Sequence, residues 1–368
     1  MQIVCAKSLK QLQDYVEGEI YIYGARTVAM RTYDYLVNND KKVKGFIVSQ
    51  KYDNPLKLMN KEVLRIENYR YKQFECIVIA VGDYCVSKKI VEDLKLYSIK
   101  KVVIVYYGVI DKYLGCKIYN HNCYIKQAEV GENVSIVVDD SSKLIIEDGV
   151  IIESGSILVA DNSIIKIKSG TYIGKKSLIS ATGCSNLVIG RESYFNQINV
   201  HVFNKSKMKM NNDTIVHNSI NIDVINNSYM CIDRNCIFNS GYISVYNSAK
   251  IEIGINCTFG ERLSLYVEKQ SKIIIGDDCM ISINVSMITG LHHIYNSENE
   301  KEITNLKPII VGNHVWCGAN SQLISGSEIG DGCVVGASSL VNKVIKANST
   351  CAGIPAKILR ECNIRWER

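Results

Sequence analysis

The sequence lacks several features that would place it in other classes of protein. Its 368 residues include only three prolines, no Cys-x-x-Cys pair and no block of five like charges. Without Cys-x-x-Cys, a zinc ribbon or a thioredoxin-like site has no support. The net charge of +6 is dispersed among Lys, Asp and Glu, and it is too mild for a nucleic-acid-binding protein. We therefore expect no bound metal and no nucleic-acid partner.

Long apolar runs are also missing. No stretch approaches the ~18 apolar residues of a membrane span. Residues 1–7 contain no apolar region of the kind found in signal peptides. The 14 cysteines are spread along the chain, so reduced thiols are expected rather than disulfides. These features lead us to expect a cytoplasmic protein without a membrane span.

Length and composition indicate a chain with a substantial core. At 368 residues the chain exceeds what one hydrophobic core usually organises, and its 47% apolar residues exclude a mainly disordered protein. Residues 20–110 alternate short apolar strands with helical patterns, which implies a parallel sheet with βαβ crossovers. We assign residues 1–115 to a small Rossmann-like α/β domain. Its predicted strands are 20–23, 43–48, 77–82 and 102–106, and its predicted helices are 28–37 and 86–96.

From about residue 130, apolar residues recur at long, regular intervals. Successive anchors are mostly 21 or 22 residues apart, with one interval of 36 and one of 18. A second apolar residue lies six places after each anchor, and a third often lies twelve places after it. Three equally spaced inward positions per turn describe a triangular parallel β-helix of about nine to ten coils. We place this all-β domain at residues 116–345, followed by a basic tail at 346–368. The anchors are Ile146, Ile167, Ile189, Met210, Ile232, Ile253, Ile275, Val311 and Ile329, and the third inward row is Leu158, Ile179, Ile222, Leu265, Met287, Leu323 and Val341.

The C-terminal coils carry a distinctive set of motifs. Residues 309–319 read Ile-Ile-Val-Gly-Asn-His-Val-Trp-Cys-Gly-Ala, and they are followed by Val335-Gly336-Ala337 and by Ala352-Gly353-Ile354-Pro355-Ala356-Lys357. This pattern resembles the hexapeptide-repeat acyltransferases, which are left-handed parallel β-helix trimers that use acyl-CoA. The N-terminal half more loosely resembles the Rossmann-like domain that precedes the β-helix in bacterial nucleotide-amino-sugar and sialic-acid acetyltransferases. The resemblance implies acetyl-CoA as co-substrate, a homotrimer, and a carbohydrate or nucleotide-sugar acceptor.

The 36-residue interval marks one break in the repeat. A plain coil has 18 residues, so this interval holds one coil and eighteen further residues. A loop therefore leaves the solenoid at residues 288–308, and it holds His292 and His293. Long loops on a rigid scaffold often carry function. Trp316 precedes the inward Cys317, so strand alternation should point its indole outward. The resemblance implies that a loop histidine a fixed stretch before this Trp is the general base, and the spacing of 24 residues selects His292 over His293.

This loop chemistry has an open alternative. An imidazole with a pKa near ~6.5 can accept the proton of a sugar hydroxyl as that hydroxyl attacks a thioester. Alternatively, both loop histidines are solvated and have no role. Glu261, just past the inward Phe259, is a candidate to orient the imidazole or contact the acceptor. A solvated corner residue is the alternative for Glu261.

The resemblance also implies a site for coenzyme A along the C-terminal coils, between adjacent subunits. The matching positions are Ala319, Ala337 and Asn342, although small residues are also expected at β-helix corners without a ligand. Residues 343–368 carry a net charge of +4, two-thirds of the chain's total. This concentration of positive charge suits the phosphates of the coenzyme. The basic candidates are Lys343, Lys357 and Arg360.

A column of cysteines and a pair of histidines suggest metal binding, but a structural role explains both better. Four cysteines each lie four residues after an anchor and so form a column. That position of the repeat takes small inward residues, and a free cysteine behaves as a small hydrophobe. His201 and His217 are 16 residues apart, but His201 falls on a predicted inward position and no third histidine stands at a suitable spacing for zinc. The four cysteines are Cys236, Cys257, Cys279 and Cys333.

Taken together, the residues and the resemblance predict an acetyl-CoA-dependent O-acetyltransferase. Its expected acceptor is a sugar hydroxyl of a surface-polysaccharide precursor, acetylated by direct transfer with His292 as the base. A first alternative keeps the donor and makes the amine of a nucleotide-linked amino sugar the acceptor. A second alternative is a non-catalytic β-helix assembly module, which predicts no binding of acetyl-CoA.

Overall fold

The computed structural model divides into two compact units. The first comprises residues 1–123 and 132–142, and the second comprises residues 124–131 and 143–368. Within the described residues, no helix has both the length and the apolar character needed to cross a bilayer. The structure describes residues 1–24, 27–50, 56–59, 61–81, 84–105, 107–110, 117–118, 122–290, 297, 299, 306–361 and 366–367.

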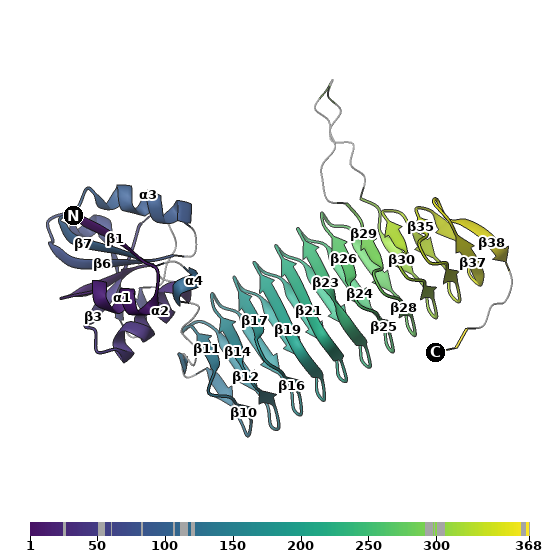
Figure 1. Ribbon diagram of the computed structural model, residues 1–368, viewed down its shortest axis with the longest axis horizontal. Helices are drawn as coiled ribbons and strands as arrows, with labels where there is room; N and C mark the ends of the chain where they lie inside the picture. Colours follow the sequence, from purple (N-terminus) through teal and green to yellow (C-terminus); the bar gives the residue numbers. More distant parts are fainter. Residues whose placement is uncertain are drawn as a thin grey trace. The chain divides into compact units, whose positions relative to one another are not determined.

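The first unit is built on a seven-stranded sheet in the order β1-β7-β6-β2-β3-β5-β4. Figure 1 shows part of this sheet with the helices α1, α2 and α3. All neighbouring pairs are parallel except β4–β5, which is antiparallel. The central strands β2, β3 and β6 are almost wholly buried, as expected when helices cover a parallel sheet. The strands are β1 (Gln2–Ala6), β2 (Ile20–Tyr23), β3 (Val43–Val48), β4 (Lys57–Leu58), β5 (Lys61–Arg65), β6 (Phe74–Ala80) and β7 (Ile99–Val105), and the main helices are α1 (Leu9–Tyr15), α2 (Thr27–Asn38) and α3 (Tyr84–Leu94).

The first unit contains every strand and helix that we expected between residues 20 and 105. The alternation of parallel strands with helices agrees with the predicted α/β pattern, while the more specific assignment as Rossmann-like stays a prediction. The strand β1 and the helix α1 were not predicted. Because β1 is an edge strand with its first residues exposed, it lacks the continuous apolar run that revealed β2 and β6.

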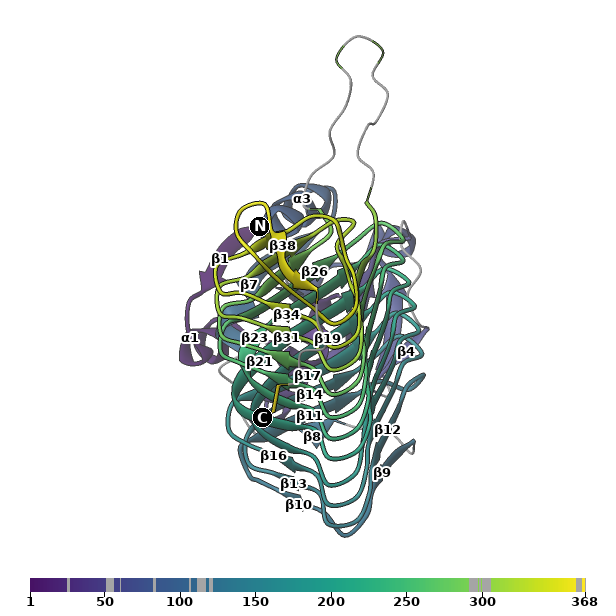
Figure 2. The ribbon, with the colours of Figure 1, turned by 90° about the vertical axis from the view of Figure 1, so that its right-hand side faces the viewer.

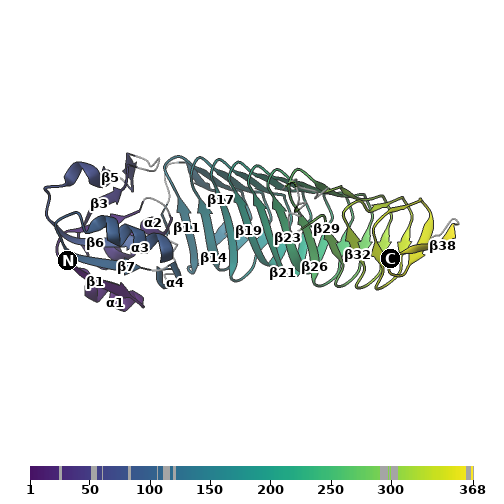
Figure 3. The same ribbon diagram turned by 90° about the horizontal axis from the view of Figure 1, so that it is seen from above.

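The second unit is a parallel β-solenoid, consistent with the predicted left-handed β-helix. Figure 2 looks along the stack of coils, and Figure 3 shows the rungs lying side by side. Its first face is an 11-stranded sheet with one strand from each coil. These strands are β9 (Cys123–Ile125), β12 (Lys143–Ile146), β15 (Ile164–Ile167), β18 (Asn186–Ile189), β20 (Lys207–Met210), β22 (Tyr229–Ile232), β24 (Lys250–Ile253), β27 (Lys272–Ile275), β30 (Ile309–Val311), β33 (Glu328–Ile329) and β36 (Val344–Ile345).

Two further faces complete each coil. In the middle coils, the long strands β19 (Tyr194–Phe203), β21 (Ile215–Ile225) and β23 (Ile237–Tyr246) contribute to both faces and shift register near the corner between them. The second face continues with β25 (Thr258–Phe259), β28 (Met280–Ile281), β31 (Trp316–Cys317), β34 (Val334–Val335) and β37 (Ser349–Ala352). The third face continues with β26 (Leu263–Val267), β29 (Ser286–Ile288), β32 (Gln322–Ile324) and β35 (Leu340–Val341).

The expected nine to ten coils are too few, because the first face alone has eleven strands. The strand β9 precedes the first anchor, and its Ile125 lies 21 residues before Ile146, so it adds one coil to the start of the repeat. The strand β36 follows the last anchor by only 16 residues, fewer than a plain coil. Residues 346–361, expected to be a tail, hold β37 and β38 (Lys357–Glu361), and β38 runs antiparallel to β37.

Three inward rows fill the solenoid, as the repeat predicted. The nine anchors and the residues six places after them are all buried. The third row has one error: Leu158 is half-buried and points outward, because Ile157 and Val159 are the inward residues of that strand. Stacked aromatic rings fill the middle coils, with the rings of Phe238 and Phe259 4.5 Å apart and 3° from parallel. The core is therefore formed by inward side chains that stack on one another at equivalent positions of successive coils.

The Phe238–Phe259 stack predicts a localised loss of stability. Replacing Phe259 with Ala should lower the free energy of unfolding by about 3–5 kcal/mol, since a buried ring is removed and the neighbouring coils cannot close the cavity. The adjacent Thr258 points outward on the same strand, and Thr258→Ala should change stability by only about 0.5 kcal/mol. Urea titration followed by circular dichroism measures both, and equal losses would contradict the inward placement of Phe259.

Candidate active site

Three of the predicted site residues occupy the same corner of the solenoid in different coils. Glu261, Ala319 and Ala337 occupy the same place in the turn between the second and third faces, and Ile283 fills that place in the coil between Glu261 and Ala319. We name these four residues the Ala337 corner. Backbone hydrogen bonds of 2.7–3.0 Å fix their alignment, from Asn284 N to Glu261 O, from Asn320 N to Ile283 O and from Ser338 N to Ala319 O.

The geometry of the Ala337 corner follows from its turn residues. The residue after each member has a left-handed backbone, with φ of 57° at Asn284 and 60° at Asn320. Asparagine tolerates this conformation, and Asn284 Nδ2 also donates to Asn320 Oδ1 at 2.7 Å. At Gly318 a Cβ would lie only 2.7 Å from Ala337 N, so the coils approach too closely for a larger residue there. The corner thus has short side chains at Ala319 and Ala337 and longer ones at Glu261 and Ile283.

Trp316 lies on the strand that leads into the Ala337 corner. Its side chain is 37% exposed, whereas the next residue, Cys317, is fully buried, so the indole points outward as alternation predicted. Its Nε1 donates to Ser282 Oγ at 3.0 Å on the preceding coil. This hydrogen bond fixes a large aromatic surface beside the corner.

A second tryptophan, not predicted as part of the site, lies against the same coil. Trp366 is only 8% exposed, and its Nε1 donates to His314 O at 3.1 Å. Its ring stacks on the His314 imidazole at 4.2 Å and lies 6.3 Å from the Trp316 ring. His314 Nδ1 in turn lies 2.8 Å from Asp278 Oδ2. Trp366 was overlooked because it falls in a segment interpreted as a solubilising basic tail, although it is one of only two tryptophans.

The basic candidates divide between two places. Arg360 and Lys357 are exposed on β38, and Arg360 lies opposite Thr350 in β37. Thr350 is paired with Val334, which is paired with Trp316, so this row runs along the second face. Asn342 and Lys343 instead follow β35 at the far end of the third face.

The loop leaves and returns at the corner between the third and first faces. Gly290 lies against Leu306, whose side chain leaves no room for a Cβ at position 290. The returning strand is held by Lys307, whose backbone N donates to Ser325 Oγ at 2.8 Å. We name residues 290, 307, 326 and 342 the loop corner, since Gly326 and Asn342 occupy the equivalent turn of the next two coils. His292 and His293 themselves lie outside the described residues.

The two corners are separate within one chain. The Ala337 corner precedes the strands of the third face, and the loop corner follows them; in the coil of Trp316 the whole of β32 stands between the corners. The structure therefore groups Trp316, Ala319 and Ala337, and it places Glu261 at the same corner three coils before Ala337. It places Asn342 and Lys343 with the base of the loop.

The cysteine column is part of the core. Cys236, Cys257, Cys279 and Cys333 are fully buried, and each thiol lies 2.9–3.1 Å from a carbonyl oxygen of the following coil. A hydrogen bond with Cys257 and burial raise the pKa of Cys236 and Cys279, and burial raises that of Cys333. Among the described residues, no group of His, Cys, Asp and Glu is arranged to hold a metal ion.

Thiol labelling tests this interpretation of the cysteines. Because the thiolate is the reactive form, iodoacetamide should label the exposed Cys184 of the native protein about 10²-fold faster than Cys236, Cys257, Cys279 or Cys333. Peptide mass spectrometry over a time course measures the rates. In urea all five should react alike, and rapid native labelling of the column would show that it is accessible.

His201 does not occupy the inward position expected from the sequence. It is half-buried and points outward, between the inward Val200 and Val202. Its Nδ1 lies 2.7 Å from Ser180 Oγ on the preceding coil. The error arose because His201 lies in a coil of 21 residues, in which the inward residues of the third face stand 11 and 13 places after the anchor, whereas in the 22-residue coil of Ile222 the inward residue stands 12 places after it.

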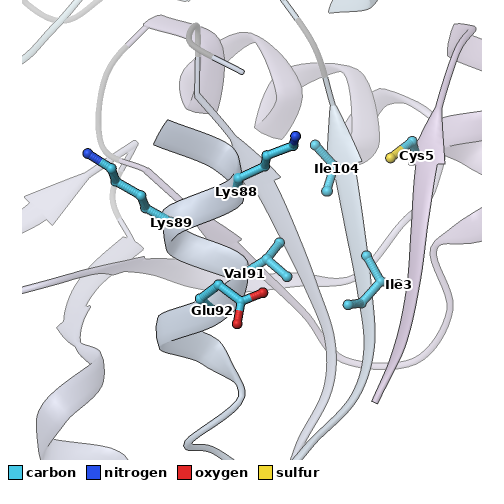
Figure 4. A pocket seen from close by; sticks show the side chains of 7 residues that line it. All are labelled: Ile3, Cys5, Lys88, Lys89, Val91, Glu92 and Ile104. Carbon is cyan, nitrogen blue, oxygen red and sulfur yellow. The ribbon is translucent and has the colours of Figure 1, made fainter. Parts of the chain in front are cut away.

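The first unit contains a separate pocket of about 440 Å³. It lies between α3 and the strands β1 and β7, with Lys88, Lys89 and Glu92 as its charged lining (Figure 4). Its strand residues are Ile3 and Cys5 of β1 and Ile104 of β7, and β1 is the edge strand of the sheet. In parallel α/β sheets, ligands bind where the strand order reverses, which in this sheet is between β6 and β2. The position of this pocket therefore does not support a nucleotide site.

The coils that carry Trp316, Ala319 and Ala337 match a known sequence repeat. Residues 308–343 match the model of the bacterial transferase hexapeptide (six repeats). The prediction of a hexapeptide-repeat protein is therefore confirmed for these coils, which include the Trp316 strand and both alanines of the corner.

Individual relatives match about a third of the chain. Galactoside O-acetyltransferase of Escherichia coli (strain K12) is 33% identical over 113 residues, covering 31% of this chain and 56% of the relative. Polysialic acid O-acetyltransferase of Escherichia coli O1:K1 / APEC is 31% identical over 117 residues, covering 32% of this chain and 38% of the relative. The chain thus spans about half the length, or less, of these relatives. The crystal structure of the polySia-specific acetyltransferase NeuO aligns with a TM-score of 0.38 at 21% identity, over 66% of this chain and 83% of that chain.

Proposed function

We propose that this protein is an acetyl-CoA-dependent acetyltransferase that modifies a sugar hydroxyl, with His292 as the general base. The observation that carries the proposal is the Ala337 corner, where small residues and an outward tryptophan lie in coils that match the transferase hexapeptide repeat. The matching relatives have names that specify acetyl transfer to galactosides and to polysialic acid. We propose a sugar of a surface polysaccharide or its precursor as the acceptor.

The proposed reaction is a direct transfer. The His292 imidazole removes the proton of the sugar hydroxyl as the oxygen attacks the thioester carbonyl carbon. When the tetrahedral intermediate collapses, the C–S bond breaks and the imidazolium returns its proton to the departing sulfur. The products are an acetyl ester and a free thiol, and no acyl-enzyme forms. Glu261 is proposed to orient the imidazole or the acceptor.

The separation of the two corners supports a site shared between subunits. In one chain, the loop corner and the Ala337 corner stand at opposite ends of the third face. We propose a homotrimer in which the loop of one subunit approaches the Ala337 corner of its neighbour. Two chains then complete each site, and a monomer would be inactive.

The coenzyme is proposed to lie along the same seam. Ala319 and Ala337 would leave space for its pantetheine arm, and Trp316 would flank it with an indole held by Ser282. Lys357 and Arg360 on β38 would meet its phosphates, with Asn342 and Lys343 contributed from the loop corner. We further propose that the Rossmann-like domain at residues 1–115 helps to hold the acceptor, while residues 116–345, with the tail 346–368, form the transferase.

A thiol-release assay against a panel of sugars and sugar nucleotides tests this function. Release of coenzyme A thiol with an amine-free sugar, together with an ester product in mass spectrometry, is the expected result. Turnover only with amino sugars would favour the N-acetyltransferase alternative. Calorimetry with acetyl-CoA adds an independent readout, since no binding at millimolar ligand would support a non-catalytic assembly module instead.

A further inference from the structure

Lysines are distributed very unevenly over the three faces of the solenoid. Among the described strands from β9 to β36, all six lysines lie on the 11-stranded first face, and none of these strands contains arginine. The same face carries only two carboxylates on its strands, Glu252 and Glu328. The six lysines are Lys143, Lys166, Lys207, Lys209, Lys250 and Lys272. We name this surface the lysine face.

The centre of the lysine face is a continuous row across four consecutive coils. Lys207 is paired in register with Tyr229, Tyr229 with Lys250, and Lys250 with Lys272. Lys250 Nζ also lies 5.3 Å from the centre of the Tyr229 ring. Because adjacent strands are about 4.8 Å apart, the row is about 14 Å long. Lys209 points outward from the same strand as Lys207 and widens the row by one residue.

Local carboxylates neutralise only part of this charge. Lys166 pairs with Glu147 at 2.8 Å, and Lys250 pairs with Glu252 at 2.8 Å. Lys207, Lys209 and Lys272 are exposed and form no ion pair among the described residues. Ammonium groups this close repel one another, because the Debye length is about 8 Å. A bound molecule whose anionic groups are spaced like these lysines would relieve the repulsion.

The row ends at the base of the proposed active-site loop. Lys272 begins β27, and its neighbour Ile273 is paired with Ile309, the first residue of β30 after the loop. A linear anionic chain lying along the row would therefore reach the loop corner. This continuity with the candidate site favours a polymer over other occupants. A second copy of this chain is disfavoured, because an interface between two lysine faces would bury like charges.

Resting on the proposed function, we propose that the lysine face binds an acidic polysaccharide and holds it beside the active-site loop. The ligand class is a linear glycan with carboxylate or other anionic groups along its length. The ammonium groups of the row would contact these anions, and Tyr229 would offer an aromatic ring between the lysines to a sugar ring. The acceptor is thus a charged polymer rather than a neutral sugar.

Binding measurements with the whole protein test this proposal without acetyl-CoA. Polygalacturonate should bind at low salt and dextran should not, and added salt should weaken the binding. The variant Lys207→Gln/Lys209→Gln/Lys272→Gln should bind polygalacturonate about 10- to 100-fold more weakly. A matched control, Lys10→Gln/Lys175→Gln/Lys176→Gln, removes the same charge from exposed positions off the lysine face and should bind normally.

Equal weakening in the two variants would overturn the proposal, because only net charge would then matter. Binding to phosphatidylserine vesicles but not to polygalacturonate would overturn it in favour of a membrane surface. Acetyl transfer to a small sugar should remain in the lysine-face variant. If no sugar is acetylated while polygalacturonate still binds through these lysines, the proposed acetyltransferase function is wrong, but the proposal that the lysine face binds an acidic polysaccharide is retained.

Discussion

Replacing His292 with Ala should lower kcat by about 10²–10⁴-fold while leaving the KM for acetyl-CoA within about threefold. The expected loss follows from removal of the group that accepts the hydroxyl proton, since a neutral sugar hydroxyl is a weak nucleophile. Coenzyme affinity should persist because the proposed donor site, around Ala319 and Ala337, is left intact. Steady-state kinetics with varied acetyl-CoA separate the two parameters.

The neighbouring histidine is the control for this experiment. His293→Ala removes an imidazole from the adjacent position of the same loop and should retain kcat within a few-fold, because the 24-residue spacing to Trp316 selects His292. Near-normal turnover by His292→Ala would remove this residue from the mechanism. A larger loss from His293→Ala than from His292→Ala would reassign the base.

Replacing Ala337 with Trp should raise the KM for acetyl-CoA by about 10²-fold or more. Ala337 is exposed at its corner, so a large side chain can be accommodated in the fold while it fills the space proposed for the pantetheine arm. The effect should be on coenzyme binding, with the unfolding transition unchanged. Calorimetry with coenzyme A and thermal denaturation measure the two properties independently.

Ala347 provides a matched control on the next coil. It is an exposed alanine at a different corner, between the first and second faces. Ala347→Trp adds the same bulk away from the proposed groove and should leave coenzyme affinity unchanged. Equal losses of affinity in the two variants would argue against a donor site at the Ala337 corner.

Much of the architecture could be predicted because its physical signal is periodic. Inward residues such as Ile189, Phe238 and Val335 recur at fixed distances, since each coil must bury three rows of side chains. The outward direction of Trp316 followed from strand alternation alone. The same rule failed at Leu158 and His201, which lie in coils of 21 residues, where the inward residues of the third face stand 11 and 13 places after the anchor instead of 12.

The contributions of the C-terminus could not be predicted in the same way. Trp366 stacks on His314 through a contact between residues 52 positions apart, and no repeat or spacing in the sequence relates them. The lysine face is different, because its residues were visible in the sequence. Lys207, Lys250 and Lys272 each lie three residues before an anchor (Met210, Ile253 and Ile275), so the repeat already predicts that they stand in one row, and the strand register agrees.

The reversed direction of β38 has a consequence for how the molecule behaves in solution. A stack of parallel coils exposes unpaired backbone amides on its last rung, and these groups could template the next molecule. The antiparallel pairing of β38 with β37 covers the second face of that rung with the protein's own chain. On this face, another molecule cannot extend the parallel stack by pairing with β37.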